Sequence, residues 1–507
     1  MITASLHSKR IDTDYYILAI LVSLAFILRV RIIGHYGLSE DEVFKMLAVK
    51  DYLNFDFSSN GQHPALCKIL MTISVIIFGE NEFALRLPNT IISSITVIPI
   101  YLLGKFLYNR DVGLMAGLFW AIEINVIAFS TTAKEDPSMV FFWTFAVYYY
   151  LKSREDQKNL KWCGIHTGLA LASKYTSILL VVLLCLIHRI DKDSIYPTLS
   201  LKDQIKIAIP YGILAFLLFN FPIFYPGTIK ELLNHYFGSQ RPYSSHTGFL
   251  MMGHIYSYRP LYSTFLFLLV KTPVLELIVM TIAILLKIRS KSSEDRILKI
   301  WLFGYLLYLF QPYGYMRYIL VLYPALFIVI SCCICQISTF ICISFERKFH
   351  NPKRAKKWVQ LLLIGAISLN ILISSFAYSP YYRLYVNEIG GGKHNTGYYF
   401  PQDDIYDYKL REAIEYVNSV ALPNATIATS VQVVGEFYGR DDLSFINIRD
   451  LPDNGSMWND LNVSFFLVQN SRIYFENKMQ IDFIKSNLTL INEFSISSVN
   501  VVEVYQY

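Results

Sequence analysis

Long apolar runs separated by short polar segments dominate the first 377 residues of the chain. A helix needs about 20 apolar residues to cross a bilayer. Such runs lie near residues 15–33, 88–108, 112–130, 137–151, 206–225, 273–287, 318–341 and 358–377. Residues 162–188 and 299–310 are also apolar but ambiguous in length. The pattern predicts a mainly α-helical, polytopic membrane protein.

Basic residues in the short connections predict how these spans are oriented. Six basic clusters flank the spans, and basic loops favour the cytoplasmic side of a membrane. If all six are cytoplasmic, the short apolar piece 65–78 cannot cross, and we expect it to lie at the outer interface. Residues 162–188 must then form two short helices that turn near 173–175, or a re-entrant pair. This arrangement gives about eleven spans in the cell membrane, with the N-terminus cytoplasmic and the C-terminus extracytoplasmic.

The last 130 or so residues follow a different pattern. We expect a transmembrane domain at residues 1–377 and a small extracytoplasmic α/β domain at 378–507. Residues 407–420 have helical spacing, whereas 425–434, 465–469 and 499–507 are rich in Val, Ile and Tyr and predict strands. An outer location fits the Asn-x-Ser/Thr acceptors, which all lie in this tail: Asn424, Asn454, Asn462 and Asn487.

Composition narrows the class of protein further. Of 507 residues, 54% are hydrophobic and 17% are charged, against about 45–50% and about 25% in soluble domains. A disordered chain, a collagen and an ordinary cytosolic enzyme are excluded. The net charge of +6 fits basic inner loops, so we expect membrane lipids and no nucleic acid as partners. None of the seven cysteines lies in the tail, which argues against a disulfide framework.

Two acidic segments lie where the chain leaves the membrane on its predicted outer side. Asp41 and Glu42 follow Ser39 after the first span, and Glu135 and Asp136 lie in a short turn between later spans. Both segments are ordinary helix starts, because caps and the helix dipole favour acids there. A carboxylate at this interface can equally act as a general base or bind a cation. The residues alone leave both interpretations open.

Cations are also predicted in the outer half of the membrane: Arg86, Lys174, Lys271 and Arg317. Such charges are costly there and indicate function unless nearby acids pair with them. Together with the carboxylates they suggest a lipid-linked phosphate that leaves by displacement while a carboxylate deprotonates an acceptor. His63, at the start of the interfacial piece, is placed to meet an anionic headgroup or to reach the water.

In this order, the motifs resemble those of the protein O-mannosyltransferases and aminoarabinose transferases, which are glycosyltransferases of the GT-C superfamily. The likeness is to prokaryotic members, of archaeal type. It covers the first 400 residues through Asp41-Glu42, His63-Pro64-x-Leu66-x-Lys68, Phe83-Ala84-x-Arg86-x-Pro88, Asp136-Pro137, residues 168–174, Lys271-Thr272-Pro273, Arg317-Tyr318, Tyr323-Pro324, residues 379–387 and the glycines 390–392.

The resemblance implies a GT-C fold with outer juxtamembrane helices and a catalytic outer loop at residues 34–87. It implies transfer of mannose or a similar hexose from a polyprenyl or dolichyl phosphate to a hydroxyl of a protein, a glycan or a lipid. The implied reaction is one inverting displacement, with Asp41 as the base and Glu42 and Asp136 as further acids. The other implied roles are donor-phosphate binding by Arg317, Lys271, Lys174 and Arg86, and acceptor or headgroup binding by His63, Glu135 and Tyr318.

Departures from the family pattern limit what the resemblance implies. Ala65 replaces a second proline after His63-Pro64, and Gln62 stands where the aminoarabinose transferases place a metal-linked glutamate. We therefore assign no metal ligands and no cofactor, although a divalent cation stays open. The Trp-Trp-Asp-Tyr-Gly signature of oligosaccharyltransferases is absent. The alternative is a polytopic transporter of an anionic or lipid-linked substrate, a class that tends to show internal repeats not found in this sequence.

Overall fold

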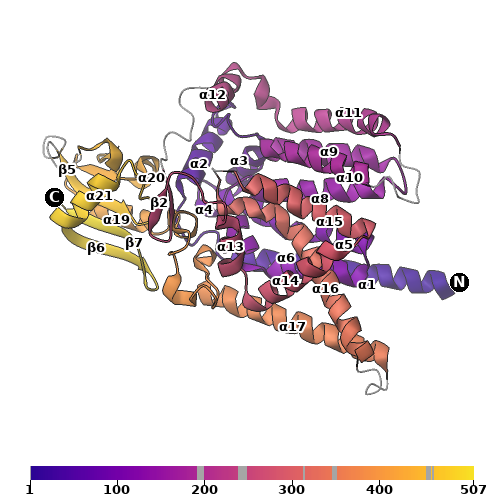
Figure 1. The fold of residues 1–507 in the computed structure, drawn as a ribbon. Helices are drawn as coiled ribbons and strands as arrows, with labels where there is room; N and C mark the ends of the chain where they lie inside the picture. Colours follow the sequence, from indigo (N-terminus) through magenta and orange to yellow (C-terminus); the bar gives the residue numbers. More distant parts are fainter. Residues whose placement is uncertain are drawn as a thin grey trace.

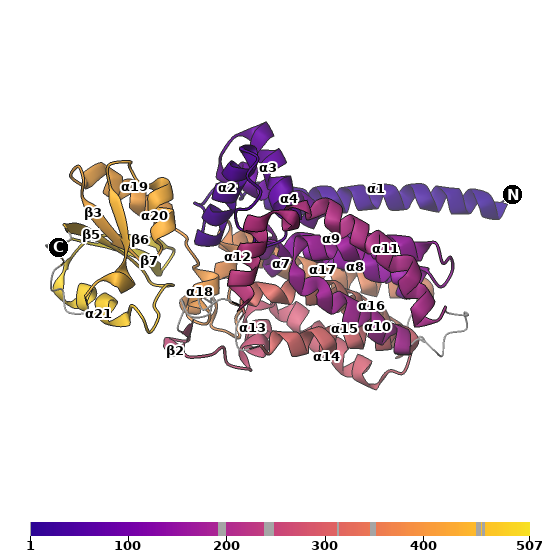
Figure 2. The same cartoon turned by 90° about the horizontal axis from the view of Figure 1, so that it is seen from above.

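The structure, a computed structural model, describes residues 2–190, 199–237, 248–311, 314–344, 351–452, 458 and 462–506, so Asn454 lies outside the described residues. Long helices form a body, and a five-stranded sheet lies at the end remote from the N-terminus (Figures 1 and 2). The helices of the body are α1 (Ile2–Val30), α4 (Glu82–Ile95), α5 (Val97–Leu107), α6 (Arg110–Ile122), α7 (Ile124–Ser130), α8 (Asp136–Lys152), α9 (Asn159–Ser173), α10 (Ile178–Ile190), α11 (Leu201–Phe219), α14 (Val274–Arg289), α15 (Ser293–Leu309), α16 (Tyr323–Ser344) and α17 (Pro352–Tyr378).

Several of these helices are long and apolar enough to cross a membrane. In the described part of the chain, four segments meet this test: Thr13–Val30, Glu82–Leu107, Met316–Ser344 and Pro352–Tyr378. A fifth is added if α6 and α7, which are bent by 59° at their junction, form one span. These segments agree with a polytopic membrane protein, and the total of about eleven spans stays a prediction.

The segment predicted to turn near residues 173–175 breaks there. Helix α9 ends at Ser173, Lys174 is extended, and α10 begins at Ile178 after a short 3-10 turn. Glycines let α9 approach α11 closely, because a side chain added at Gly168 would meet the backbone carbonyl of Gly212. The prediction of two short helices is therefore confirmed, and the break brings Lys174 out of the helix.

Short helices gather at the end of the body that faces the sheet (Figure 2). Helix α3 matches the apolar piece predicted at 65–78 and packs against α2 and α4, and a small hairpin joins the same end. These elements are α2 (Glu40–Leu53), α3 (Leu66–Phe78), α12 (Pro226–Phe237), β1 (Phe249–Met251), β2 (His254–Tyr256), α13 (Ser263–Lys271) and α18 (Pro401–Asp404).

The sheet has the strand order β4-β3-β5-β7-β6. Strand β3 is parallel to β4 and β5, and β7 is antiparallel to β5 and β6, with Ile427 opposite Phe445 and Phe465. Its elements are α19 (Leu410–Val420), β3 (Thr426–Thr429), α20 (Gln432–Tyr438), β4 (Ser444–Asn447), β5 (Val463–Gln469), α21 (Lys478–Asn487), β6 (Thr489–Ile496) and β7 (Val499–Gln506).

Alternating side chains fill both faces of this sheet. Phe465 and Leu467 pack on the α19 side, whereas Phe466 and Val468 pack on the α21 side. The predicted helix and the strands at 465–469 and 499–507 are confirmed. The strand predicted at 425–434 is wrong in its second half, since β3 ends at Thr429 and α20 begins at Gln432. A short apolar run does not distinguish the two elements.

The α19 side of the sheet shares its hydrophobic core with the loop that follows α1. Val43 and Met46 of α2 and Met71 of α3 lie in one buried cluster with Ile414 of α19 and Val502 of β7. The sheet is thus packed directly on the short helices of residues 34–87. A domain boundary at 377/378 stays a prediction.

Candidate active site

The start of α2 holds Asp41 in place. Ser39 caps the helix, and the carboxylate of Glu42 accepts a hydrogen bond from the Ser39 backbone N–H at 3.1 Å. The backbone N–H of Glu40 donates to Oδ2 of Asp407, 2.8 Å away in the segment before α19. The helix-start interpretation of this segment is therefore confirmed, and it fixes the direction of the neighbouring Asp41 side chain.

Glu42 and Arg86 form a fully buried ion pair. Arg86 Nε and Nη2 lie 2.8 and 2.9 Å from the Glu42 carboxylate oxygens, and the N–H of Ala133 donates to the same carboxylate at 2.8 Å. Burial disfavours the charged carboxylate, but the guanidinium outweighs it and lowers the pKa of Glu42 to about 2. The remaining Arg86 N–H groups donate to the carbonyls of residues 33, 36 and 37. Arg86 has no N–H left for a donor phosphate.

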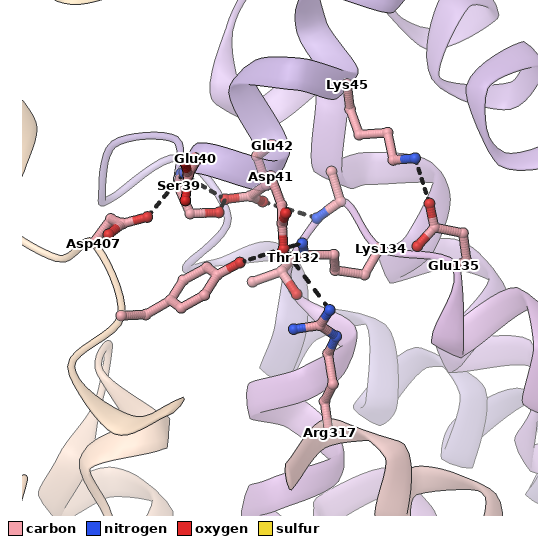
Figure 3. A network of polar contacts seen from close by, with 12 residues as sticks. Ser39, Glu40, Asp41, Glu42, Lys45, Thr132, Lys134, Glu135, Arg317 and Asp407 are labelled. Carbon is pink, nitrogen blue, oxygen red and sulfur yellow. Dashed lines mark hydrogen bonds and ion pairs between the residues drawn. The ribbon is translucent and has the colours of Figure 1, made fainter. Parts of the chain in front are cut away.

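Asp41 lies at the centre of the cluster in Figure 3. Its Oδ2 accepts hydrogen bonds from the ammonium of Lys134 and from the Tyr406 hydroxyl, the latter at 2.8 Å. Arg317 Nη2 lies 3.8 Å from the same oxygen. Burial and the nearby Arg317 charge hold the pKa of Lys134 well below its usual range. The Asp41 side chain is still 39% exposed, so its carboxylate is open to a substrate.

Asp136, the first residue of α8, belongs to the same cluster. Lys174 Nζ lies 2.7 Å from one carboxylate oxygen and Arg317 Nε lies 3.4 Å from the other. Lys174 also lies 3.9 Å from the centre of the Tyr318 ring. Arg317 therefore joins Asp41 to Asp136, although the two are nearly 100 residues apart. Its buried Nη1 has no hydrogen-bond partner within the described part of the chain.

Glu135 turns toward a different set of partners. It is buried and forms an ion pair with Lys45 of α2, which also donates to Oδ1 of Asn60 at 2.6 Å. His63 Nδ1 lies 3.6 Å from the same Glu135 carboxylate, and its ring is 38% exposed. Although burial disfavours the charged form, Lys45 holds the pKa of Glu135 well below its usual range. His63 and Glu135 thus lie together, and Glu135 is adjacent in sequence to Asp136.

Lys271 is withdrawn from the other cations. Its Nζ lies 2.6 Å from Asp404 and donates to the backbone carbonyl of Arg383 at 3.0 Å, and its side chain is buried. Burial raises the pKa of Asp404 to about 7 despite this ion pair. The Lys271 ion pair anchors α18 to the body, and it leaves Lys174 and Arg317 as the predicted cations beside the acids.

Three functional candidates were not predicted from the sequence. Lys134 lies in the predicted acidic turn, where its charge is visible in the sequence but had no function assigned to it. Tyr406 and Arg383 come from the segment between α17 and α19, which carried family motifs but no site prediction. Arg383 Nη2 lies 3.3 Å from Oγ1 of Thr132, and its guanidinium lies 4.6 Å from the Tyr406 ring centre. The segment thus adds a hydroxyl and a cation to the site.

An ion pair ties the sheet to α2. Arg472, which follows β5, donates from Nε and Nη2 to the Asp407 carboxylate at 2.9 and 2.6 Å. Its Nη1 donates to Glu40 at 3.0 Å.

Beside this pair a cavity of about 280 Å³ reaches Asp41. Among the residues that the structure describes, no group of three or more His, Cys, Asp or Glu side chains is placed to hold a metal ion.

Comparison with known families matches the early part of the chain. Residues 62–220 match the family described as dolichyl-phosphate-mannose-protein mannosyltransferase. This range includes the His63 motif, Arg86, Asp136 and Lys174. A search of curated protein sequences gives no match.

Solved structures match along nearly the whole chain. ArnT from Cupriavidus metallidurans in the apo state superposes with a TM-score of 0.60 at 10% identity, covering 98% of each chain. The same enzyme bound to undecaprenyl phosphate gives 0.58 at 10% identity, over 96% of this chain and 97% of that one. The archaeal oligosaccharyltransferase AglB from Archaeoglobus fulgidus, in complex with an inhibitory peptide and a dolichol-phosphate, gives 0.54 at 13% identity, over 90% and 69%. The family match bears out the resemblance at residues 62–220, and the solved structures bear out the fold expected from it, whereas the number of spans stays a prediction.

Proposed function

We propose that this chain is a GT-C glycosyltransferase of the O-mannosyltransferase and aminoarabinose-transferase type, and that it transfers a hexose such as mannose from a polyprenyl phosphate to an acceptor hydroxyl. The family match at residues 62–220 and the similarity of its fold to ArnT support this proposal. The observation that carries the proposal is the position of Arg317 between Asp41 and Asp136. A buried guanidinium with an unused N–H, next to an exposed carboxylate, offers a phosphate and an acceptor adjacent sites.

Arg317 and Lys174 are suited to the donor phosphate. A guanidinium binds phosphate oxygens through several N–H groups at once, and an ammonium adds a second charge. Both groups already lie within 3.4 Å of Asp136, so that carboxylate holds them in position before a donor binds. As the phosphate leaves, its growing negative charge is stabilised by cations that need no rearrangement. The ArnT structure with bound undecaprenyl phosphate supports this class of donor.

Asp41 is suited to act as the base. The acceptor oxygen forms a new bond to the anomeric carbon while the bond from that carbon to the phosphate oxygen breaks. The phosphate leaves with the electron pair of the broken bond, and the acceptor proton moves to Asp41. The Tyr406 hydroxyl and Lys134 hold the carboxylate in one orientation. The site would lie on the extracytoplasmic face, as the basic-loop topology predicts.

The direct test uses purified protein in lipid with polyprenyl-phosphate mannose or polyprenyl-phosphate glucose. A general base contributes about 10²–10⁴-fold to the rate, so Asp41→Asn should lose at least about 100-fold of donor consumption. Glu80→Gln is the matched control, because Glu80 forms an exposed ion pair with Lys50 outside the site. Equal consumption by wild type and Asp41→Asn would refute Asp41 as the base. A transporter would leave both donors intact.

A further inference from the structure

The cavity beside Asp41 has no role in the donor chemistry described above. We infer that this cavity is the acceptor subsite and that it binds a sugar unit, so that the acceptor is a glycan or a sugar-bearing lipid headgroup. The inference rests on the proposed function, since it places the acceptor relative to the proposed base. It goes beyond that proposal by naming the chemical class of the acceptor and the residues that select it.

The position of the cavity is typical of ligand sites in open α/β sheets. Ser430 follows β3, Asn447 ends β4, and Arg472 comes shortly after β5, and all three line the cavity. These strands are parallel, so their carboxyl ends meet at one edge, where such sheets bind ligands. The opposite wall is the start of α2, with Glu40 and Asp41. A ligand held at the sheet edge therefore reaches the proposed base.

The lining combines aromatic faces with hydrogen-bonding groups. Phe44, Tyr315 and Tyr474 supply rings that can cover the C–H face of a sugar. Arg449 and Glu476, 3.9 Å apart, add a donor group and an acceptor group for hydroxyls. Phe44 is 44% exposed, so its ring is accessible to a ligand in the cavity. The cavity volume of about 280 Å³ suits a compact ring.

An extended peptide fits this cavity less well. One common way for an extended peptide to bind beside a sheet is to pair its backbone with a free strand edge. The sheet edges are β4 and β6, yet β4 contributes only its last residue to the lining and β6 contributes none. The walls are side chains that converge on a pocket. The geometry therefore favours a sugar ring over a polypeptide.

Saturation-transfer NMR with the full-length protein in lipid tests the inference without any turnover. The probes are α-mannobiose and a serine/threonine-rich peptide, each at millimolar concentration. We expect mannobiose signals in wild type and their loss, by at least about fivefold, in Phe44→Ala and in the Arg449→Ala, Glu476→Gln double variant. The three side chains are partly exposed, so these changes should leave the fold intact. Glu493→Gln on β6 at the far edge is the matched control.

The outcomes separate this inference from the proposed function. No mannobiose binding in wild type, or binding that all variants retain, overturns the sugar subsite even if donor consumption depends on Asp41. Peptide signals that vanish in the pocket variants overturn it in favour of a protein acceptor. Mannobiose binding that is lost in the pocket variants but kept in Asp41→Asn supports the subsite, even if neither donor is consumed.

Discussion

Arg86 and Arg317 carry the same guanidinium group but differ in how fully the protein uses it. All N–H groups of Arg86 bind Glu42 or backbone carbonyls, whereas Nη1 of Arg317 has no partner in the described residues. A guanidinium whose N–H groups are all hydrogen-bonded within the protein supports the fold, whereas one with an unused N–H group is available to a ligand. The sequence predicts both arginines in the outer half of the membrane near acidic residues, and it does not distinguish their roles.

This difference predicts opposite phenotypes. Arg86→Ala leaves Glu42 buried without a cation and should cost about 3–5 kcal/mol of unfolding free energy, as broken buried pairs do. Arg317→Ala should lose most donor consumption with a smaller change in thermal stability, because Asp136 keeps its 2.7 Å ion pair with Lys174 and Asp41 is partly exposed. Thermal unfolding and donor consumption, measured on both variants, check this. A stable Arg86→Ala or a fully active Arg317→Ala would contradict the assignment.

Tyr406 gives a second prediction at the same scale. Tyr406→Phe keeps the ring and removes the hydrogen bond to Asp41. Bonds to charged groups contribute about 1.5–3 kcal/mol, so we expect kcat to fall roughly 10- to 100-fold with the KM for the donor unchanged. Tyr416→Phe on α19 is the control. An unchanged kcat would remove Tyr406 from the site.

The sequence identified Asp41 and Asp136 by local motifs, but a partner 365 residues away left no local signal.

The start of α2 is the element that orients Asp41, the proposed base. This helix start can be predicted from the local sequence, because a serine followed three positions later by a glutamate is a capping signal. The break between α9 and α10 could likewise be predicted, because basic residues flank both ends of residues 162–188 and both ends are therefore expected on the cytoplasmic side. Less could be predicted where apolar runs were short, as in β3 and α20, or where strands such as β6 show weak alternation of exposed and half-buried residues.

The α2 start also predicts a pH dependence. The folded pKa of Glu42, about 2, lies below its ordinary value of 4.5, so the charged form stabilises the fold. This contribution, about 3 kcal/mol, is fully present above about pH 4.5 and is lost as the pH falls toward 2. Melting temperatures of wild type should drop between about pH 4.5 and pH 2, and Glu42→Gln should start lower and drop less. Parallel curves would contradict the role of Glu42, and Glu80→Gln should follow wild type.

At the scale of the whole molecule, the site depends on contact between the sheet and the helical body. Arg472 and Asp407 join the two, and the cores of α2, α3 and the sheet are continuous. The apolar pattern and the tail composition predicted a helical body followed by an α/β unit. They could not predict how the two dock, because docking depends on ion pairs and packing between distant residues.

Breaking that contact should reduce transfer. Arg472 holds the sheet on α2 and also lines the proposed acceptor cavity, so its loss affects both. Arg472→Ala leaves Asp407 buried without its cation, so we expect slower sugar transfer and faster proteolytic cleavage between α18 and α19. Limited proteolysis and donor consumption measure both effects. Lys478→Ala, which removes an exposed ion pair on α21, should change neither. Rapid cleavage with full activity would show that the sheet is dispensable for the reaction.

The shared core has a consequence for how such enzymes could acquire new acceptors. Grafting a foreign tail onto residues 1–377 would set unmatched side chains against Val43, Met46 and Met71, and the resulting misfit would displace the helix that carries Asp41. A workable graft must therefore move the loop at 34–87 together with the sheet. With the roles proposed above, acceptor binding and the position of the base depend on one packed unit, even though more than 300 residues separate its parts in the chain.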